Sequence, residues 1–237
     1  MFRSAVTILL AFALSACALN IKRPVSEDDL GKTKRVGVVS ILGDSFQGIH
    51  IGTTVFNNEY FSAPVPEWNI DKYATAAALQ LLRSNPRFES AEVDRGTLSA
   101  EQIRADKGKA LWEAAEAQHF DRLVIVRPGV SENFKFFKPS FGLLERSIFA
   151  LSHRCIYAAY IVDVYDVAKR EPIAWEWGGG MPCRFGSDDD LRFKEHFTDY
   201  SPGEQDEMRK RLDAYLSSSL RYSLTKLSLV PAESTAK

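Results

Sequence analysis

The pattern of apolar and polar residues predicts an alternation of β-strands and α-helices along most of the chain. Short, mostly apolar runs bounded by Gly, Pro, Asn or Asp predict strands, and apolar residues that recur every three or four positions predict helices. Strands are expected at 35–42, 49–56, 88–94, 122–127, 157–167 and 173–177, and helices at 70–84, 99–119 and from 202 onward. We expect the first two strands to form a hairpin around Gly43-Asp44-Ser45, and residues 59–69 to form a loop.

Capping sequences mark the starts of two of these helices. Ser99 is followed three residues later by Gln102, and Ser201 is followed by Glu204. Both pairs match the capping box, in which the serine side chain accepts from the backbone of the third helical residue. Gly108 is expected to interrupt the helix over 99–119, because glycine is unfavourable inside a helix.

The order of the elements predicts the fold class and the domain boundaries. Strands followed by two helix–strand steps, a late hairpin and a final helix indicate a single α/β domain, a mixed β-sheet with packed helices. We assign residues 35–230 to this domain and expect residues 131–153 to be an aromatic insertion in it. Residues 17–34 are polar and carry a Pro and a Gly, which predicts a flexible tether, and residues 231–237 form a tail.

The element order also resembles that of a known periplasmic domain. An opening strand with the sequence Val36-Gly37-Val38-Val39, two helix–strand steps and a late hairpin are similar to the domain of the curli-secretion channel lipoprotein and of the N-terminus of TolB. The resemblance concerns the fold, and a fold alone does not define a function.

The first 17 residues have the features of an export signal. A basic start, Met1-Phe2-Arg3, precedes an apolar run over 5–14 that is about half as long as a membrane-spanning helix. The sequence Leu14-Ser15-Ala16-Cys17 resembles the bacterial lipobox. That resemblance implies removal of residues 1–16 and attachment of a lipid to Cys17, which would hold the protein on a membrane. The alternative is an ordinary signal peptide with Cys17 as a bystander.

The lipobox resemblance also implies a location in the cell. Lipoproteins are held in the cell envelope, and in the enteric type an Asp directly after the lipid-bearing Cys favours the inner membrane. Ala18 occupies this position, which favours the outer membrane with the domain facing the periplasm.

Composition narrows the classes of partner and cofactor. The chain of 237 residues has 30 basic and 31 acidic residues, and no basic block or stripe occurs, which argues against nucleic-acid binding. Hydrophobic residues make up 45%, enough for a substantial core. The four histidines lack metal-ligand spacing, and the glycine run at 178–180 lacks the Lys-Ser/Thr of a phosphate loop. We therefore expect neither a metal nor another cofactor.

The two remaining cysteines flank the predicted late hairpin. Cys155 and Cys183 are each 14 residues from Lys169, the centre of the expected turn. Residues placed in this way face each other across an antiparallel pair, and a non-hydrogen-bonded pair brings their β-carbons close enough for a disulfide. An exported protein meets an oxidising compartment, so we predict a Cys155–Cys183 bridge. The alternative is two buried free thiols.

One sequence block resembles a hydrolase motif. Gly43-Asp44-Ser45-Phe46 is similar to the opening block of GDS-type serine hydrolases, in which the serine is the nucleophile. That family also carries Asp-x-x-His, whereas His196 follows Phe193-Lys194-Glu195. The leading hypothesis is therefore a non-enzymatic envelope lipoprotein that binds another envelope component, and the block is then a turn. The alternative is an envelope serine esterase that uses Ser45.

The segment 134–151 is rich in phenylalanine and interrupts the strand–helix pattern. Its apolar residues after Pro139-Ser140 recur at helical spacing, which predicts a short amphipathic helix. The hypothesis is that an exposed surface of this segment meets the bilayer or an envelope protein, through Phe136, Phe137, Phe141, Leu144 and Ile148. The alternative is that the segment packs over the domain's own core.

The lipobox makes a direct prediction in the native host. Replacing Cys17 with Ser removes the thiol that accepts the lipid, so Cys17→Ser should accumulate as an unprocessed precursor. The wild-type protein should incorporate labelled palmitate, and the variant should not. Normal processing of the variant, together with an unlabelled wild type, would show that the signal is an ordinary one.

Overall fold

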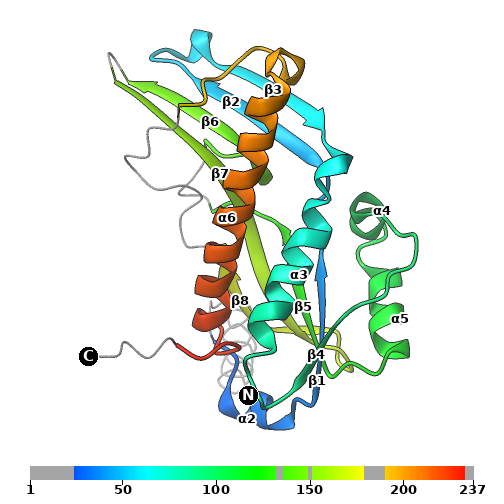
Figure 1. The fold of residues 1–237 in the computed structure, drawn as a ribbon. Coiled ribbons are helices and arrows are strands. Elements are labelled where there is room, and N and C mark those ends of the chain that lie inside the picture. Colours follow the sequence, from blue (N-terminus) through cyan, green and yellow to red (C-terminus); the bar gives the residue numbers. More distant parts are fainter. Residues whose placement is uncertain (1–23, 132–135, 149–150, 179–189, 233–237) are drawn as a thin grey trace, which may run out of the picture.

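Residues 24–131, 136–148, 151–178 and 190–232 are described by a computed structural model (Figure 1). They form one mixed β-sheet of eight strands with helices packed against it, so the predicted fold class is confirmed. The strands are β1 (Arg35–Ser40), β2 (Ser45–Ile51), β3 (Glu59–Pro64), β4 (Glu89–Glu92), β5 (Arg122–Pro128), β6 (Ser140–Ile148), β7 (Leu151–Asp166) and β8 (Glu171–Trp177). Their order is β3-β2-β6-β7-β5-β1-β4, and β8 pairs with β7.

The sheet consists of two halves that share the 16-residue strand β7. Residues 151–159 of β7 pair antiparallel with β6, and residues 160–166 pair antiparallel with β5. We call the half that contains β1, β4, β5 and β8 the proximal half, and the half that contains β2, β3 and β6 the distal half. In the proximal half, β1 lies parallel between β4 and β5, and β8 pairs with the other edge of β7. In the distal half, β2 lies between β6 and the edge strand β3. The two halves lie one above the other in Figure 1.

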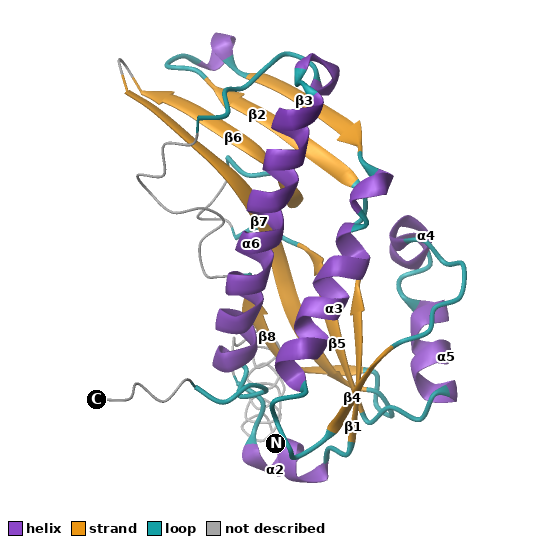
Figure 2. Ribbon diagram, in the orientation of Figure 1, coloured by secondary structure: helices purple, strands orange, loops and turns teal. Residues whose placement is uncertain are grey.

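Helices cover the two halves differently (Figure 2). They are α2 (Glu27–Lys32), α3 (Ile70–Leu82), α4 (Ala100–Ala105), α5 (Lys109–Ala117) and α6 (Pro202–Lys226). Val36 and Val38 of β1 belong to the core beneath α3 and α6, whereas Val39 belongs to the core beneath α4 and α5. Both faces of the sheet are therefore buried at β1 and β5, which explains why these two strands have nearly continuous apolar runs.

The predicted helix starts are confirmed. Ser99 and Gln102 form a capping box at α4, and Ser201 and Glu204 form one at α6. Gly108, with φ of +79°, separates α4 from α5, as glycine at this position allows. Within α6 the buried side chains are spaced by three or four residues along one face and include Met208, Leu212, Leu216, Leu220 and Leu224.

The predicted hairpin between residues 35–42 and 49–56 is wrong. β1 pairs with β4 and β5, and β2 pairs with β3 and β6. The block at Gly43 therefore connects β1 of the proximal half to β2 of the distal half. Residues 59–64, which we expected to lie in a loop, form β3 and pair with β2. Pro64 is tolerated there because it ends an edge strand.

The predicted amphipathic helix in the aromatic segment is also wrong, because residues 140–148 form β6. Phe141 is fully buried against the α6 side of the sheet, and Leu144 is buried on the opposite side. Both faces of β6 are covered, so its apolar residues occur at spacings that mimic a helix. Phe141 and Leu144 therefore belong to the core and form no interaction surface, and the side chain of Ile148 lies outside the described residues.

The predicted tether is shorter than its expected bounds of 17–34. Residues 24–34 pack onto the domain: Ser26 caps α2, and the side chains of Val25 and Leu30 are buried. The backbone N–H of Val25 donates to the carbonyl of Leu227 at 3.1 Å, which ties the segment to the end of α6. Residues 1–23, which hold the signal, Cys17 and the rest of the tether, lie outside the described residues.

Two phenylalanines of the aromatic segment test this placement. Phe141→Ala removes a fully buried ring from the core and should lower the free energy of unfolding by about 3–5 kcal/mol. Phe136→Ala removes a ring that is 43% exposed and should cost about 1 kcal/mol or less. Denaturant titrations of both variants give the two values. Equal losses would contradict the assignment of Phe141 to the core.

Candidate functional site

Ser45, the candidate nucleophile, begins β2 and is half-buried. Its Oγ lies 2.7 Å from Ser62 Oγ on β3, and Gln47 Nε2 donates to it at 3.0 Å. Within the described part of the chain, these are its side-chain partners, and neither can take a proton from the hydroxyl. A serine without an adjacent base stays a weak nucleophile. The hydroxyl therefore closes a small polar network between β2 and β3.

The block before Ser45 is built as a structural turn. Gly43 has a φ of +84°, a conformation that favours glycine. Asp71, near the start of α3, accepts from the Gly43 backbone N–H at 3.2 Å and from Ser40 Oγ at 2.8 Å. Burial raises the pKa of Asp71, while the Ser40 hydroxyl and the nearby Arg95 guanidinium, 3.5 Å away, oppose that rise. The polar residues of this block thus hold β1, β2 and α3 together.

A group of exposed aromatic residues lies at the end of the distal half. We call it the distal aromatic surface; it comprises Val55, Phe56, Tyr60, Phe136, Lys138 and Arg146. Phe56 is 94% exposed and Val55 76% exposed in the connection between β2 and β3. Tyr60 on β3 is 52% exposed. Among the large hydrophobic side chains of the described residues, these three are the most exposed.

Two cations lie over the rings of this surface. The Lys138 ammonium lies 5.2 Å from the centre of the Tyr60 ring, and the Arg146 guanidinium lies 4.4 Å from the centre of the Phe136 ring. Tyr60 pairs with Ile49, whose side chain belongs to the core on the face away from α6. Tyr60 therefore lies on the outer face of the distal half, and the surface combines aromatic rings with positive charge.

The aromatic segment packs against the core through Phe137, next to Phe136 of this surface. Phe137 is half-buried, and its ring meets that of Tyr157 edge to face with a centroid distance of 5.0 Å. Tyr157 is fully buried, and burial raises the pKa of its hydroxyl. Of the five residues expected to form an interaction surface, Phe136 is exposed and Phe137 anchors the segment that presents it. Residues 132–135 of this segment lie outside the described residues.

Val55, Phe56 and Tyr60 are not predicted from the sequence as surface residues. The predicted strand over 49–56 includes the first two, and the predicted loop over 59–69 includes Tyr60. The available signal was the polar pair Asn57-Asn58, which directly follows Val55-Phe56. Asn-rich pairs favour turns, so a turn there would have exposed the two preceding apolar side chains.

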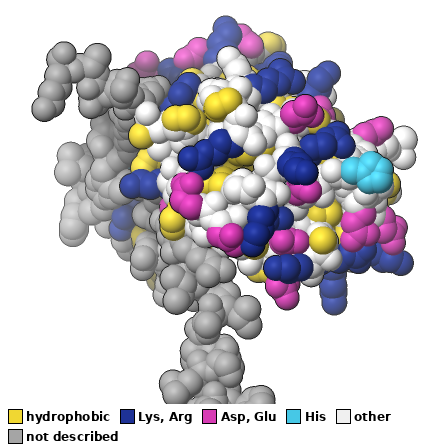
Figure 3. Space-filling model, turned by 90° about the horizontal axis from the view of Figure 1, so that it is seen from below, with side chains coloured by type: hydrophobic (Ala, Val, Ile, Leu, Met, Phe, Trp, Pro, Cys, Tyr) yellow, Lys and Arg dark blue, Asp and Glu magenta, His cyan; other side chains and the backbone are white. Residues whose placement is uncertain are grey.

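The opposite end of the molecule has a different character. Figure 3 views it from below, where basic and acidic side chains alternate with small apolar areas between them. Within the described residues, three or more His, Cys, Asp or Glu side chains nowhere come close enough to hold a metal ion. The helices in those same residues include none that is both long and apolar enough to cross a membrane.

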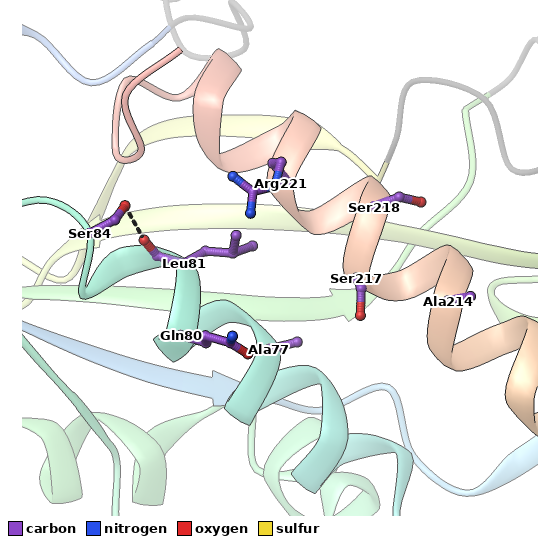
Figure 4. Close-up of a pocket in the computed structure, with 8 residues that line it drawn as sticks. All are labelled: Ala77, Gln80, Leu81, Ser84, Ala214, Ser217, Ser218 and Arg221. Carbon is purple, nitrogen blue, oxygen red and sulfur yellow. Dashed lines mark hydrogen bonds between the residues drawn. The ribbon is translucent and has the colours of Figure 1, made fainter. Parts of the chain in front are cut away.

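A groove of about 520 Å³ runs between α3 and α6 (Figure 4). Ala77 and Gln80 line it from α3, and Ala214, Ser217 and Ser218 line it from α6. Three of the α6 side chains are short and leave space between the helices, and Arg221 of α6 lines the groove as well (Figure 4). Tyr73 of α3 spans the helices nearby: its hydroxyl lies 2.7 Å from Ser217 Oγ and donates to the Asp213 carbonyl. The groove follows from this helix packing and offers few charged groups.

The observed register of β7 and β8 bears on the predicted Cys155–Cys183 bridge. Ile161 pairs with Trp177, and each is eight residues from Lys169, the centre assumed from the sequence. The Gly178 N–H donates to the Tyr160 carbonyl at 2.8 Å, so Tyr160 and Gly178 form a hydrogen-bonded pair. Positions 155 and 183 are each five residues from this pair. Because five is an odd number, the same register would make them a non-hydrogen-bonded pair. Cys155 is buried in β7, whereas Cys183 lies outside the described residues, and the bridge stays a prediction.

Comparisons with known proteins add a distant likeness of fold. No protein-family model and no curated protein matches the chain. A solved structure of a PelC dodecamer from Paraburkholderia phytofirmans matches 88% of this chain and 95% of its own, with 10% identity and a TM-score of 0.36. At this TM-score the match carries no argument about fold or function.

The register argument predicts how the cysteines react. In the exported wild-type protein, Cys155 and Cys183 should resist alkylation under denaturing conditions until a reductant is added. Loss of the bridge in a Cys155→Ala, Cys183→Ala variant should lower the free energy of unfolding by about 2–4 kcal/mol. Peptide mass mapping with and without reductant identifies the pair. Free alkylation of both thiols without reductant would show that no bridge forms.

Proposed function

We propose that the protein is a non-enzymatic lipoprotein of the cell envelope whose domain binds another envelope component through the distal aromatic surface. The observation that carries the proposal is the exposure of Phe56, Val55 and Tyr60 at one end of the domain. Burying large apolar side chains is the main favourable term in folding and association, so a group of exposed ones indicates a surface that a partner covers.

The position of this surface favours a partner in the periplasm. Pro24, the first described residue, comes seven residues after Cys17, which limits their separation to about 25 Å. The segment 24–34 is fixed to the domain at α2, at the end opposite the β2–β3 connection (Figure 1). The 25-residue helix α6, about 37 Å long, runs between the two ends. A lipid at Cys17 would therefore hold the α2 end at the membrane and present the distal aromatic surface away from it.

The chemistry of the surface favours a protein partner. Aromatic residues and Arg are the residue types most enriched in the centres of protein interfaces. Lys138 and Arg146 carry positive charge beside the rings, so the complementary surface would combine an apolar pocket for Phe56 with acidic residues. The alternative function, an esterase that uses Ser45, gains no support from the described contacts of its hydroxyl.

Site-specific photo-crosslinking in the native host tests the proposal. A photoreactive residue at Phe56 should give one discrete adduct in envelope fractions, because a partner covers this position. The matched control is Tyr222, a similarly large aromatic residue that is 43% exposed near the end of α6, far from the surface. The adduct at position 56 should weaken when Lys138 and Arg146 are both changed to Glu. Equal adducts at positions 56 and 222, or an adduct at 222 alone, would contradict the proposal.

A further inference from the structure

A small hollow lies where the connection between α4 and α5 covers the ends of two parallel strands. The chain leaves β1, forms β2 and β3 of the distal half, and returns to β4 by way of α3 on one face of the sheet. It then passes from β4 to β5 by way of α4 and α5 on the opposite face. The two connections thus diverge from β1, and in such sheets ligands bind beside the carboxyl ends of the strands at this divergence. The hollow has this location, because Ile41 and Arg127 at the ends of β1 and β5 both line it.

The walls of the hollow are mainly apolar. Its volume is about 170 Å³, and Leu111, Ile103 and Ile125 contribute aliphatic walls. Trp112 of α5 and Tyr165 of β7 meet edge to face with a centroid distance of 5.0 Å and add aromatic surface. An apolar cavity of about 150 Å³ accommodates a benzene ring. The space therefore suits one small, flat apolar group.

Two arginines at the hollow are held in fixed positions. Arg104 Nη1 donates to the Ile41 carbonyl at 2.6 Å, and its Nη2 lies 2.8 Å from Glu101. Arg127 Nε donates to the buried carboxylate of Asp163, with Nη2 also on that carboxylate. Each guanidinium has five N–H donors, so both keep donors beyond these contacts. Their charges are balanced by Glu101 and Asp163, and their remaining donors are oriented in advance.

Lys107 also lines the hollow, and its positive charge, unlike those of the two arginines, is not paired with a carboxylate of the described residues. Among the described residues, its ammonium has no ion-pair or hydrogen-bond partner, whereas the nearby Asp106 carboxylate accepts from the backbone N–H groups of Gly108 and Ala110. Lys107 also has a φ of 57°, in the left-handed region where a residue with a side chain is disfavoured. The backbone here suits glycine, yet the chain places a lysine at the rim of the hollow.

We propose that this hollow binds a small organic anion, a carboxylate attached to a flat apolar body about the size of a benzene ring. The apolar walls take the ring, and Lys107 with the free N–H donors of the two arginines takes the carboxylate. Burial and the Asp163 carboxylate raise the pKa of Tyr165, so its hydroxyl stays protonated and can donate as well. The site lies in the proximal half and is independent of the proposed partner surface.

Benzoate is the probe, and the full chain in detergent is the sample. Titration should shift the indole N–H resonance of Trp112, which Trp112→Phe identifies. Benzamide, a neutral molecule of the same shape, should bind roughly ten-fold more weakly or worse, because it lacks the charge. Lys107→Gly should weaken benzoate binding by a similar factor. This change removes the ammonium and suits the left-handed backbone, so the variant should fold at least as well as the wild type.

His119→Gly is the matched control for the backbone effect. His119 is an exposed residue with a φ of 58° at the end of α5, outside the hollow. It should leave the benzoate affinity unchanged. The proposal fails if benzoate at millimolar concentration does not move the Trp112 resonance, or if benzamide binds equally well. It also fails if inorganic phosphate binds as tightly as benzoate, or if Lys107→Gly and His119→Gly have the same effect.

Discussion

The structure depends on β7 running without a break through both halves of the sheet. Its residues pair with β6 at one end and with β5 and β8 at the other. At the junction, Tyr160 is buried and its hydroxyl lies 2.6 Å from Ser219 Oγ of α6. A side chain at Gly178 would place its Cβ 2.4 Å from the Tyr160 ring, so this position requires glycine. One strand thus fixes the two halves and α6 relative to one another.

The other strands change at the level of this junction. β2 follows β1 along the sheet, and β6 follows β5. β5 and β6 run in the same direction, because both are antiparallel to β7. β1 and β2 also share this direction, because β1 is parallel to β5 and β2 is parallel to β6. Ser140, at the start of β6, has a φ of 92°, and its buried hydroxyl donates to the Leu42 carbonyl in the first of these connections. The two interruptions are therefore joined to each other by a hydrogen bond, and each depends on the uninterrupted β7 beside it.

This arrangement explains which parts of the fold were predictable from the sequence. The capping boxes at Ser99 and Ser201 and the late hairpin depend on residues close in sequence, and these predictions are confirmed. β1 pairs with β5, and β2 pairs with β6, in each case about 80 to 100 residues further along the chain. The local turn motif at Gly43 therefore indicated the wrong partner. Periodicity also failed for Phe141 and Leu144, because a strand buried on both faces has no polar alternation.

The candidate site was predictable only in part for the same reason. Phe136 was found because aromatic density is visible in the sequence, but Tyr60 joins it through strand pairing between β2 and β3. The grouping of Arg104, Lys107 and Arg127 around one hollow requires α4 to lie over the ends of β1 and β5. A single sequence shows the residue types and their local spacing. It does not show which distant residues the sheet brings together.

The division of the sheet also determines where each half can bind a ligand. In the proximal half, α3 and α6 cover one face and α4 and α5 the other, so ligands can approach at the strand ends, beside the α4–α5 connection. In the distal half, α6 lies on one face, and the outer face is covered in part by Val130 and Phe137, which leaves Tyr60 and Arg146 near the surface. A small molecule can be enclosed in the first setting, whereas the second offers a broad surface suited to another macromolecule. The same continuous strand that joins the halves therefore separates two kinds of recognition.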